Sequence, residues 1–309
     1  MDMRSGMVRH GLQLPDVSSS PPVEGGSQPM TSMGDIEVRL ARTPAEVAAA
    51  QRLRYHVFYA ERGARPDSRM RRSQRDVDVY DSLMDHLVVI DHGRSAVQGR
   101  VVGNYRLLRR ESLGPHGHFY SSGEFDIQPL LGSGQRLLEL GRSCVLREYR
   151  SLPVLQLLWR GIAAYVAEHR IELMFGCASL HGTDAGAWRE QLAYLHHYHL
   201  APAELRPRAL PSTRIDIAHI GKACVDPARA MAGLEPIIKG YLRLGAGVGE
   251  GACLDRQFNA IDICIVMPTS RLKQKYLRHY QRGCAQPLLV HAPDPEPALA
   301  LEARLAVAG

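Results

Sequence analysis

The stretch "RLLELGRSCVLREYRS", residues 136–151, has the composition of a buried strand with two charges in its middle. Glu139 and Arg142 lie in apolar surroundings with Gly141 between them. On a regular strand their side chains would point to opposite faces, and an unpaired buried charge costs several kcal/mol or more. A β-bulge at Gly141 would bring both side chains to one face. We predict this bulge, either around a structural ion pair or at a cleft that holds a base beside an arginine.

The neighbouring segments predict an α/β fold with one mixed sheet. The predicted order is strand 36–42, helix 45–62, hairpin strands 86–91 and 100–110, strand 136–146, helix 153–170, strand 171–178 and helix 183–199. Helix 153–170 is a crossover, so the strands before and after it should be parallel neighbours. Thr43, Pro44 and Glu46 form a capping box with the preferred proline at the start of the first helix.

Other segments have weaker patterns. Residues 63–81 read as a polar loop, and Thr183 or Asp184 is the expected cap of helix 183–199. Three stretches after residue 200 suggest further strands and a Gly-rich segment, namely 211–220, 235–249 and 259–268.

The composition of the 309 residues indicates one folded domain with peripheral ends. Residues 1–34 predict a disordered leader, 35–283 the domain and 284–309 a peripheral tail. The net charge of +6 favours an anionic partner, and we expect no nucleic acid. Six scattered cysteines, no signal peptide and no spanning apolar run predict reduced, buried thiols in a cytoplasmic protein.

Charged residues before the central strand are candidates for a site. Arg54 and Phe58 would share a helix face with Glu61, and Arg54 would point toward an anion or a carboxylate. Four aspartates follow within ten residues and could form a solvated loop, and the first two could instead hold a cationic amine or pair with Arg54 and Arg106. These aspartates are Asp76, Asp78, Asp81 and Asp85.

Histidines and basic runs carry weaker signals. His196, His197 and His199 lack the spacing and the acidic neighbour of a metal site, so we expect no metal. The run 69–75 is a solvated basic loop or a docking surface for an acidic carrier. The basic stretch 270–283 predicts a helix that packs on the domain or lies on anionic lipid.

Taken in chain order, several motifs resemble one branch of a known superfamily. They are "LRYHVFYAE", "DVDVYD", "YRLLRR", "LELGRSCV", "LLWRGIAAYV" and "LMFGCASLHGTD". The chain resembles the autoinducer-synthase-like GNAT acyltransferases, and within them the L-ornithine N-alpha-acyltransferases, over about residues 36–270. The resemblance implies a GNAT-like, mostly antiparallel sheet with flanking helices, whose two splayed parallel strands form the acyl-pantetheine cleft.

The resemblance also implies an activity: transfer of a 3-hydroxyacyl chain from acyl carrier protein to the α-amine of L-ornithine, giving lyso-ornithine lipid. The donor would be the phosphopantetheine thioester, with no separate cofactor, and the enzyme could lie peripherally on the inner face of the cytoplasmic membrane. Glu139 would be the general base, and backbone N–H groups around Ser143 would bind the oxyanion. The substrate-binding candidates are Arg54, Phe58, Asp76, Asp78, Asp81 and Arg106, with Arg142 beside the base.

Two departures from related families bear on the substrate. The lactone synthases carry a Trp soon after the "VF" pair, which this chain lacks, and "REYRSLPV" replaces the usual GNAT pyrophosphate loop. Acetyl-CoA is therefore disfavoured as the donor. The alternatives are an acyl-homoserine lactone synthase, an acyltransferase for glycine, glutamine or lysine, and a non-catalytic membrane-bound or carrier-binding module.

Overall fold

The computed structural model describes residues 30–272 except 96–98, 116, 151 and 218–219. The helices are α1 (Pro44–Tyr55), α2 (Ser68–Ser73), α3 (Gln128–Leu131), α4 (Leu152–Glu168), α5 (Arg189–His199), α6 (Pro227–Gly233) and α7 (Pro236–Leu244). The main sheet contains β1 (Thr31–Met33), β2 (Ile36–Leu40), β3 (Asp85–Asp91), β4 (Val101–Arg109), β6 (Leu137–Val145), β7 (Leu173–His181), β9 (Arg214–Ile215), β10 (Gly247–Val248), β11 (Ala252–Asp255) and β12 (Ala260–Pro268). Two short strands, β5 (Phe125–Asp126) and β8 (Arg208–Ala209), pair separately.

The main sheet runs in the order β1-β2-β3-β4-β6-β7-β12-β11-β9, and β10 also pairs with β12. Among the described strands, β6 and β7 form the one parallel pair, and the crossover helix α4 connects them. The predicted mixed, mostly antiparallel sheet with a parallel pair at its centre is confirmed.

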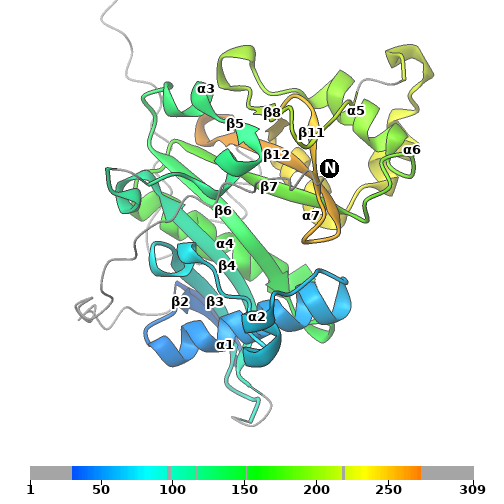
Figure 1. Cartoon of the computed structure of the whole chain (residues 1–309). Helices are drawn as coiled ribbons and strands as arrows, with labels where there is room; N and C mark the ends of the chain where they lie inside the picture. The colour runs from blue at the N-terminus through cyan, green and yellow to red at the C-terminus, as the bar shows by residue number, and fades with distance from the viewer. Residues whose placement is uncertain (1–29, 96–98, 116, 151, 218–219, 273–309) are drawn as a thin grey trace, which may run out of the picture.

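Helices cover both faces of this sheet (Figure 1). Apolar residues of α4 and α7 pack on one face against alternate residues of the strands, such as Leu138 and Leu140. Residues of α1 and of the segment 119–130 cover the other face, where Leu137 and Cys144 lie. Glu139 shares the parity of Leu137, so its side chain belongs to the face covered by α1 and residues 119–130.

Most elements predicted up to residue 180 are confirmed. Thr43 accepts a hydrogen bond from the Glu46 N–H as the N-cap of α1, and Pro44 is the first helical residue. The Glu46 carboxylate interacts with the backbone N–H groups of both Arg42 and Thr43. The helix continues as a π-helical turn over His56–Glu61. Because of this turn, Glu61 does not share a helix face with Arg54 as predicted. Glu61 pairs with Arg150, whereas Arg54 pairs with Asp76.

Several predictions are wrong in detail. The polar segment 63–81 contains α2, which is capped by Asp67, and a 3-10 turn, Val79–Ser82. Helix α5 begins at Arg189, because Asp184 accepts from the N–H of Gly186 in a turn instead of capping a helix. Within the Gly-rich stretch 235–249, residues Pro236–Leu244 form helix α7, which was not predicted.

The predicted ends are only partly described. Strand β1 lies within the segment 1–34 expected to be a disordered leader, and it pairs with β2. The tail 284–309 and most of the basic stretch 270–283 lie outside the described residues. Cys224 is exposed, contrary to the expectation of buried thiols. Within the described residues, no helix is both long and apolar enough to cross a bilayer.

Candidate active site

The central strand contains the predicted bulge, one residue later than expected. Between β4 and β6 the register shifts, with Arg106 opposite Gly141 and Asn104 opposite Cys144. Two β6 residues, Arg142 and Ser143, therefore lie opposite Tyr105. Arg142 has a φ of 51°, a left-handed conformation that costs a non-glycine residue about 1–3 kcal/mol. The strain lies at Arg142 and not at Gly141, which has no positive φ.

The bulge places Glu139 and Arg142 on one face, where both contact Tyr120. The Glu139 side chain is buried, and its two oxygens accept the backbone N–H groups of Tyr120 (2.9 Å) and Ser121 (2.6 Å). The Arg142 guanidinium lies 4.8 Å from the centre of the Tyr120 ring and 4.2 Å from that of Phe258. Burial raises the pKa of Glu139, although these N–H donors favour its charged form.

Arginines and aspartates form a buried network beside this pair. Arg54 donates from Nε to Asp76 (2.8 Å) and from Nη2 to Asp81 (2.6 Å). Arg106 donates from Nη1 to Asp78 (2.6 Å) and Asp81 (3.3 Å). Arg142 is 3.4 Å from both Asp76 and Asp78. Three guanidinium groups therefore face three carboxylates, which leaves the network without spare negative charge for an ammonium group.

The network is held together by opposite charges. Burial alone would raise the pKa of Asp76, but Arg142, Arg54 and Arg106 outweigh it and hold that pKa below its ordinary value. Arg106 and Arg142 likewise lower the pKa of Asp78 against the effect of burial. Both carboxylates therefore stay ionised at neutral pH.

The other candidates lie at the edge of this cluster or on the opposite face. Phe58 packs edge-on against Phe258, with ring centres 5.8 Å apart, and so supports the ring that covers Arg142. Ser143 is hydrogen-bonded to Tyr105, whose hydroxyl is bonded to that of Tyr241. Asp85 binds Tyr165 and lies outside the network.

Strands β6 and β7 diverge directly beyond Glu139. They pair only from Leu137 to Glu139, opposite Leu173 to Phe175, although both strands continue. An opening follows, lined by Leu140, Gly176, Cys177 and Tyr241 among others. The structure thus contains the splayed parallel pair, with a buried carboxylate at its last paired position.

Gly176 is required at this divergence because a β-carbon there would lie 2.2 Å from the carbonyl oxygen of Leu140. We expect Gly176→Ala to push β6 and β7 apart and to lower kcat/KM on the order of 100-fold, since small misplacements of catalytic groups have effects of that size. Gly240→Ala is the control, because a β-carbon there meets nothing within 4 Å. Steady-state kinetics with circular dichroism test this, and a folded Gly176→Ala protein with normal kcat/KM would contradict it.

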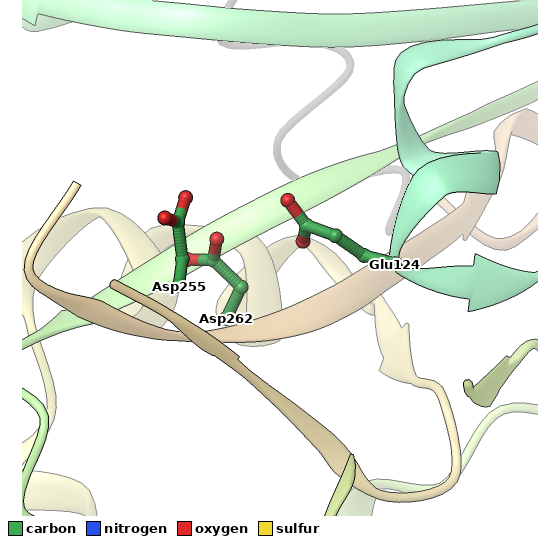
Figure 2. A group of neighbouring side chains, drawn as sticks. All are labelled: Glu124, Asp255 and Asp262. Carbon is green, nitrogen blue, oxygen red and sulfur yellow. The ribbon is translucent and has the colours of Figure 1, made fainter. Parts of the chain in front are cut away.

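A second cluster of acids was missed by the sequence reasoning. Glu124, Asp255 and Asp262 place carboxylate oxygens within 4.8 Å of one another, and Figure 2 shows Glu124 pointing toward the two aspartates. Among the described residues, this is the one group of three side chains with the spacing to hold a metal ion. Asp262 interrupts the apolar run "AIDICIVMP", which was the available signal, whereas nothing local marked Glu124.

Comparisons with known proteins show which family the chain belongs to. The family model described as acetyltransferase (GNAT) domain matches residues 53–160. An L-ornithine N(alpha)-acyltransferase of Rhodobacter capsulatus is 45% identical over 247 residues, which cover 80% of this chain and 95% of that protein. A protein of the same name from Agrobacterium fabrum is 41% identical over 251 residues, or 80% and 86% of the two chains.

Among solved structures, FeeM, an N-acyl amino acid synthase from uncultured soil microbes, is 10% identical with a TM-score of 0.43. The match covers 81% of this chain and 95% of that one. The chain is an acyltransferase with the GNAT fold. It belongs to the family of the L-ornithine N(alpha)-acyltransferases.

Proposed function

We propose that this enzyme transfers a 3-hydroxyacyl group from acyl carrier protein to the α-amine of L-ornithine, giving lyso-ornithine lipid. The observation that best supports acyl transfer is the position of the buried Glu139 carboxylate, which is the last paired residue before β6 and β7 diverge. The names of the relatives support ornithine as the acceptor.

In this proposal, Glu139 acts as the general base. The carboxylate accepts hydrogen bonds from two backbone N–H groups and from the side chain of Ser121, and a remaining lone pair can take a proton from the acceptor ammonium group. The free amine then attacks the thioester carbon, and backbone N–H groups at the bulge around Ser143 meet the developing oxyanion. The C–S bond then breaks, the attacking nitrogen gives its extra proton to the departing sulfur, and the pantetheine leaves as a thiol as the amide forms.

The arginine–aspartate network has a positioning role in this proposal. Arg142 faces the base across Tyr120, and its contacts with Asp76 and Asp78 fix the direction of its guanidinium. A guanidinium has five N–H donors, so Arg142 can also orient the acceptor carboxylate. Arg54, Arg106, Asp81 and Phe58 hold this arrangement in place.

Charge and loop sequence support a carrier protein as the donor. After β6 the chain forms a 3-10 turn at Arg147–Tyr149 and enters α4 without the Gly-rich loop that binds a nucleotide pyrophosphate. Helix α2 carries the basic run, with Arg69, Arg71 and Arg72 exposed. Such a surface suits an acidic protein that brings only the pantetheine arm.

The test is a reaction of the purified full chain with 3-hydroxyacyl carrier protein and L-ornithine. We expect release of free carrier thiol together with a product whose mass equals that of acyl-ornithine. Replacing ornithine with S-adenosylmethionine should give no lactone. Absence of product with ornithine, or efficient transfer from acyl-CoA in place of the carrier, would contradict the proposal.

A further inference from the structure

The cluster of Glu124, Asp255 and Asp262 has no part in the mechanism above. Asp262 lies on β12 and Asp255 at the end of β11, while Glu124 directly precedes β5. Because Asp262 pairs with Cys253 across the hairpin, Asp255 and Asp262 share one face of the sheet. The segment that carries Glu124 covers this face (Figure 2). Three chain segments thus bring their carboxylates together in one cluster.

Two of these carboxylates have an oxygen without a donor, whereas Asp255 accepts the backbone N–H groups of Gln257 and Phe258. Asp262 is only 3% exposed. Its Oδ1 atom and Oε2 of Glu124 are both buried with no hydrogen-bond partner among the described residues. Burial and mutual repulsion raise the pKa of Glu124 and of Asp262. A buried acceptor without a donor is unfavourable, so a cation with N–H donors that binds there would stabilise the cluster.

Ser121 and Cys177 connect the proposed base to the acidic cluster. Ser121, whose N–H binds Glu139, accepts a hydrogen bond from the thiol of Cys177 (3.4 Å). Cys177 also lies beside the Glu124 carboxylate, and it lines the opening between β6 and β7. Ser121 and Cys177 therefore lie between the proposed base and the acidic cluster.

We propose that Glu124, Asp255 and Asp262 bind the side-chain ammonium group of the amino acid acceptor and so select a diamino acid. This inference rests on the proposed function. It gives the second amino group of ornithine a binding site outside the arginine–aspartate network, because that network has no spare negative charge for an ammonium group. An ammonium group has three N–H donors, which matches three converging carboxylates. With its δ-nitrogen held there, the α-nitrogen is the amine left to react.

A divalent cation fits the same residues less well. Mg²⁺ and Ca²⁺ take six or more oxygen ligands, and the neighbouring groups include the thiol of Cys177, which suits neither ion. One ammonium group supplies the missing donors to both orphaned oxygens and needs no further protein ligand. The cluster is therefore better matched to an alkylammonium group than to a hard metal ion.

The experiment compares L-ornithine with L-norvaline, which has the same carbon skeleton without the terminal amine, as acceptors for the full chain. The wild type should favour ornithine in kcat/KM by on the order of 100-fold or more, because a site built for hydrogen bonds rejects an analogue that lacks the group. Asp262→Asn and Glu124→Gln should each reduce this ratio at least tenfold, mainly through a higher KM for ornithine. The control Asp126→Asn, an exposed residue close to Glu124, should keep the wild-type ratio.

Other outcomes distinguish failure of the proposed function from failure of the ammonium-site inference. Wild-type protein that acylates no amino acid would overturn the proposed function and this inference with it. Wild-type protein that acylates ornithine, with variants that keep the preference over norvaline, would overturn this inference alone. Equal loss of kcat with both acceptors would mean a role in proton transfer, and loss of the preference on treatment with EDTA would mean a metal site. Either result would contradict ammonium binding.

Folding of the variants can be checked independently. Asp262→Asn removes one of three mutually repelling carboxylates, so the unliganded variant should melt at or above the wild-type temperature. Ornithine should raise the melting temperature of the wild type but raise that of Asp262→Asn much less. Equal stabilisation of both proteins by ornithine would contradict the assignment.

Discussion

Glu139→Gln is expected to lower kcat by about 100- to 10,000-fold, the usual contribution of a positioned general base. Glutamine keeps the size of the side chain but cannot take a proton from the acceptor. In the wild type, kcat/KM should rise with pH as Glu139 loses its proton, at a pH above the ordinary range of a glutamate because burial raises its pKa. The variant should lack this dependence, and pH profiles of both proteins measure it.

Glutamine also disturbs one structural contact, so a matched control is needed. Glu139 accepts two backbone N–H groups, whereas the glutamine amide has a single acceptor oxygen. Glu172 is a suitable control, since it too accepts a backbone N–H, from Arg136, and is half exposed. Glu172→Gln should retain kcat within about twofold. Unchanged kcat in Glu139→Gln, or a loss that preserves the wild-type pH profile, would refute the assignment of Glu139 as base.

Asp76→Asn should lower the free energy of unfolding by about 3–5 kcal/mol, because it leaves buried arginines without a full counter-charge. Asp76 and Arg54 are both fully buried, and Asp76 also accepts a hydrogen bond from Tyr59 (3.0 Å). For a domain of this size, the loss corresponds to a drop in melting temperature on the order of 10 °C. Thermal and urea unfolding measure both quantities.

The pH dependence of stability separates this ion network from ordinary packing. The pKa of Asp76 is held below its ordinary value of 3.8, so its contribution is complete above that pH and is lost as the pH falls further. The difference in stability between wild type and Asp76→Asn should therefore shrink on acidification below about pH 4. Asp67→Asn, which keeps an N-cap on α2, is the control and should change stability by less than about 0.5 kcal/mol. A constant difference down to pH 2 would contradict the ion-pair account.

Local patterns predicted the centre of the fold well, because each element there is specified by its own residues. The capping residues of α1 and the continuous apolar run of β7 are local signals that tertiary packing does not override. The bulge could also be predicted, since charges of opposite parity in one buried strand require an irregularity. Its exact residue could not, because Arg142 adopts the strained conformation and its contacts with Asp76 and Asp78 lie far away in sequence.

Long-range contacts limited the prediction of the site. One of the alternatives for Asp76, pairing with Arg54, is confirmed, because a basic helix face and an acidic segment lie close together in the chain; Asp81 as a second partner of Arg54 was not predicted. Glu124 and Asp262, in contrast, lie on segments that only the sheet order brings together, and a single glutamate in a loop has no distinguishing pattern. Helix α7 was not predicted within the Gly-rich stretch 235–249, because its apolar residues face a core that the sequence alone does not reveal.

The central claim is that acyl transfer occurs at the α-nitrogen of ornithine while the δ-ammonium group is held away from the thioester. The most direct measurement is the structure of the product formed by the purified enzyme from 3-hydroxyacyl carrier protein and ornithine, determined by NMR and fragmentation mass spectrometry. We predict a single amide at the α-nitrogen with a free δ-amine. An amide at the δ-nitrogen, or a mixture of both products, would contradict the account.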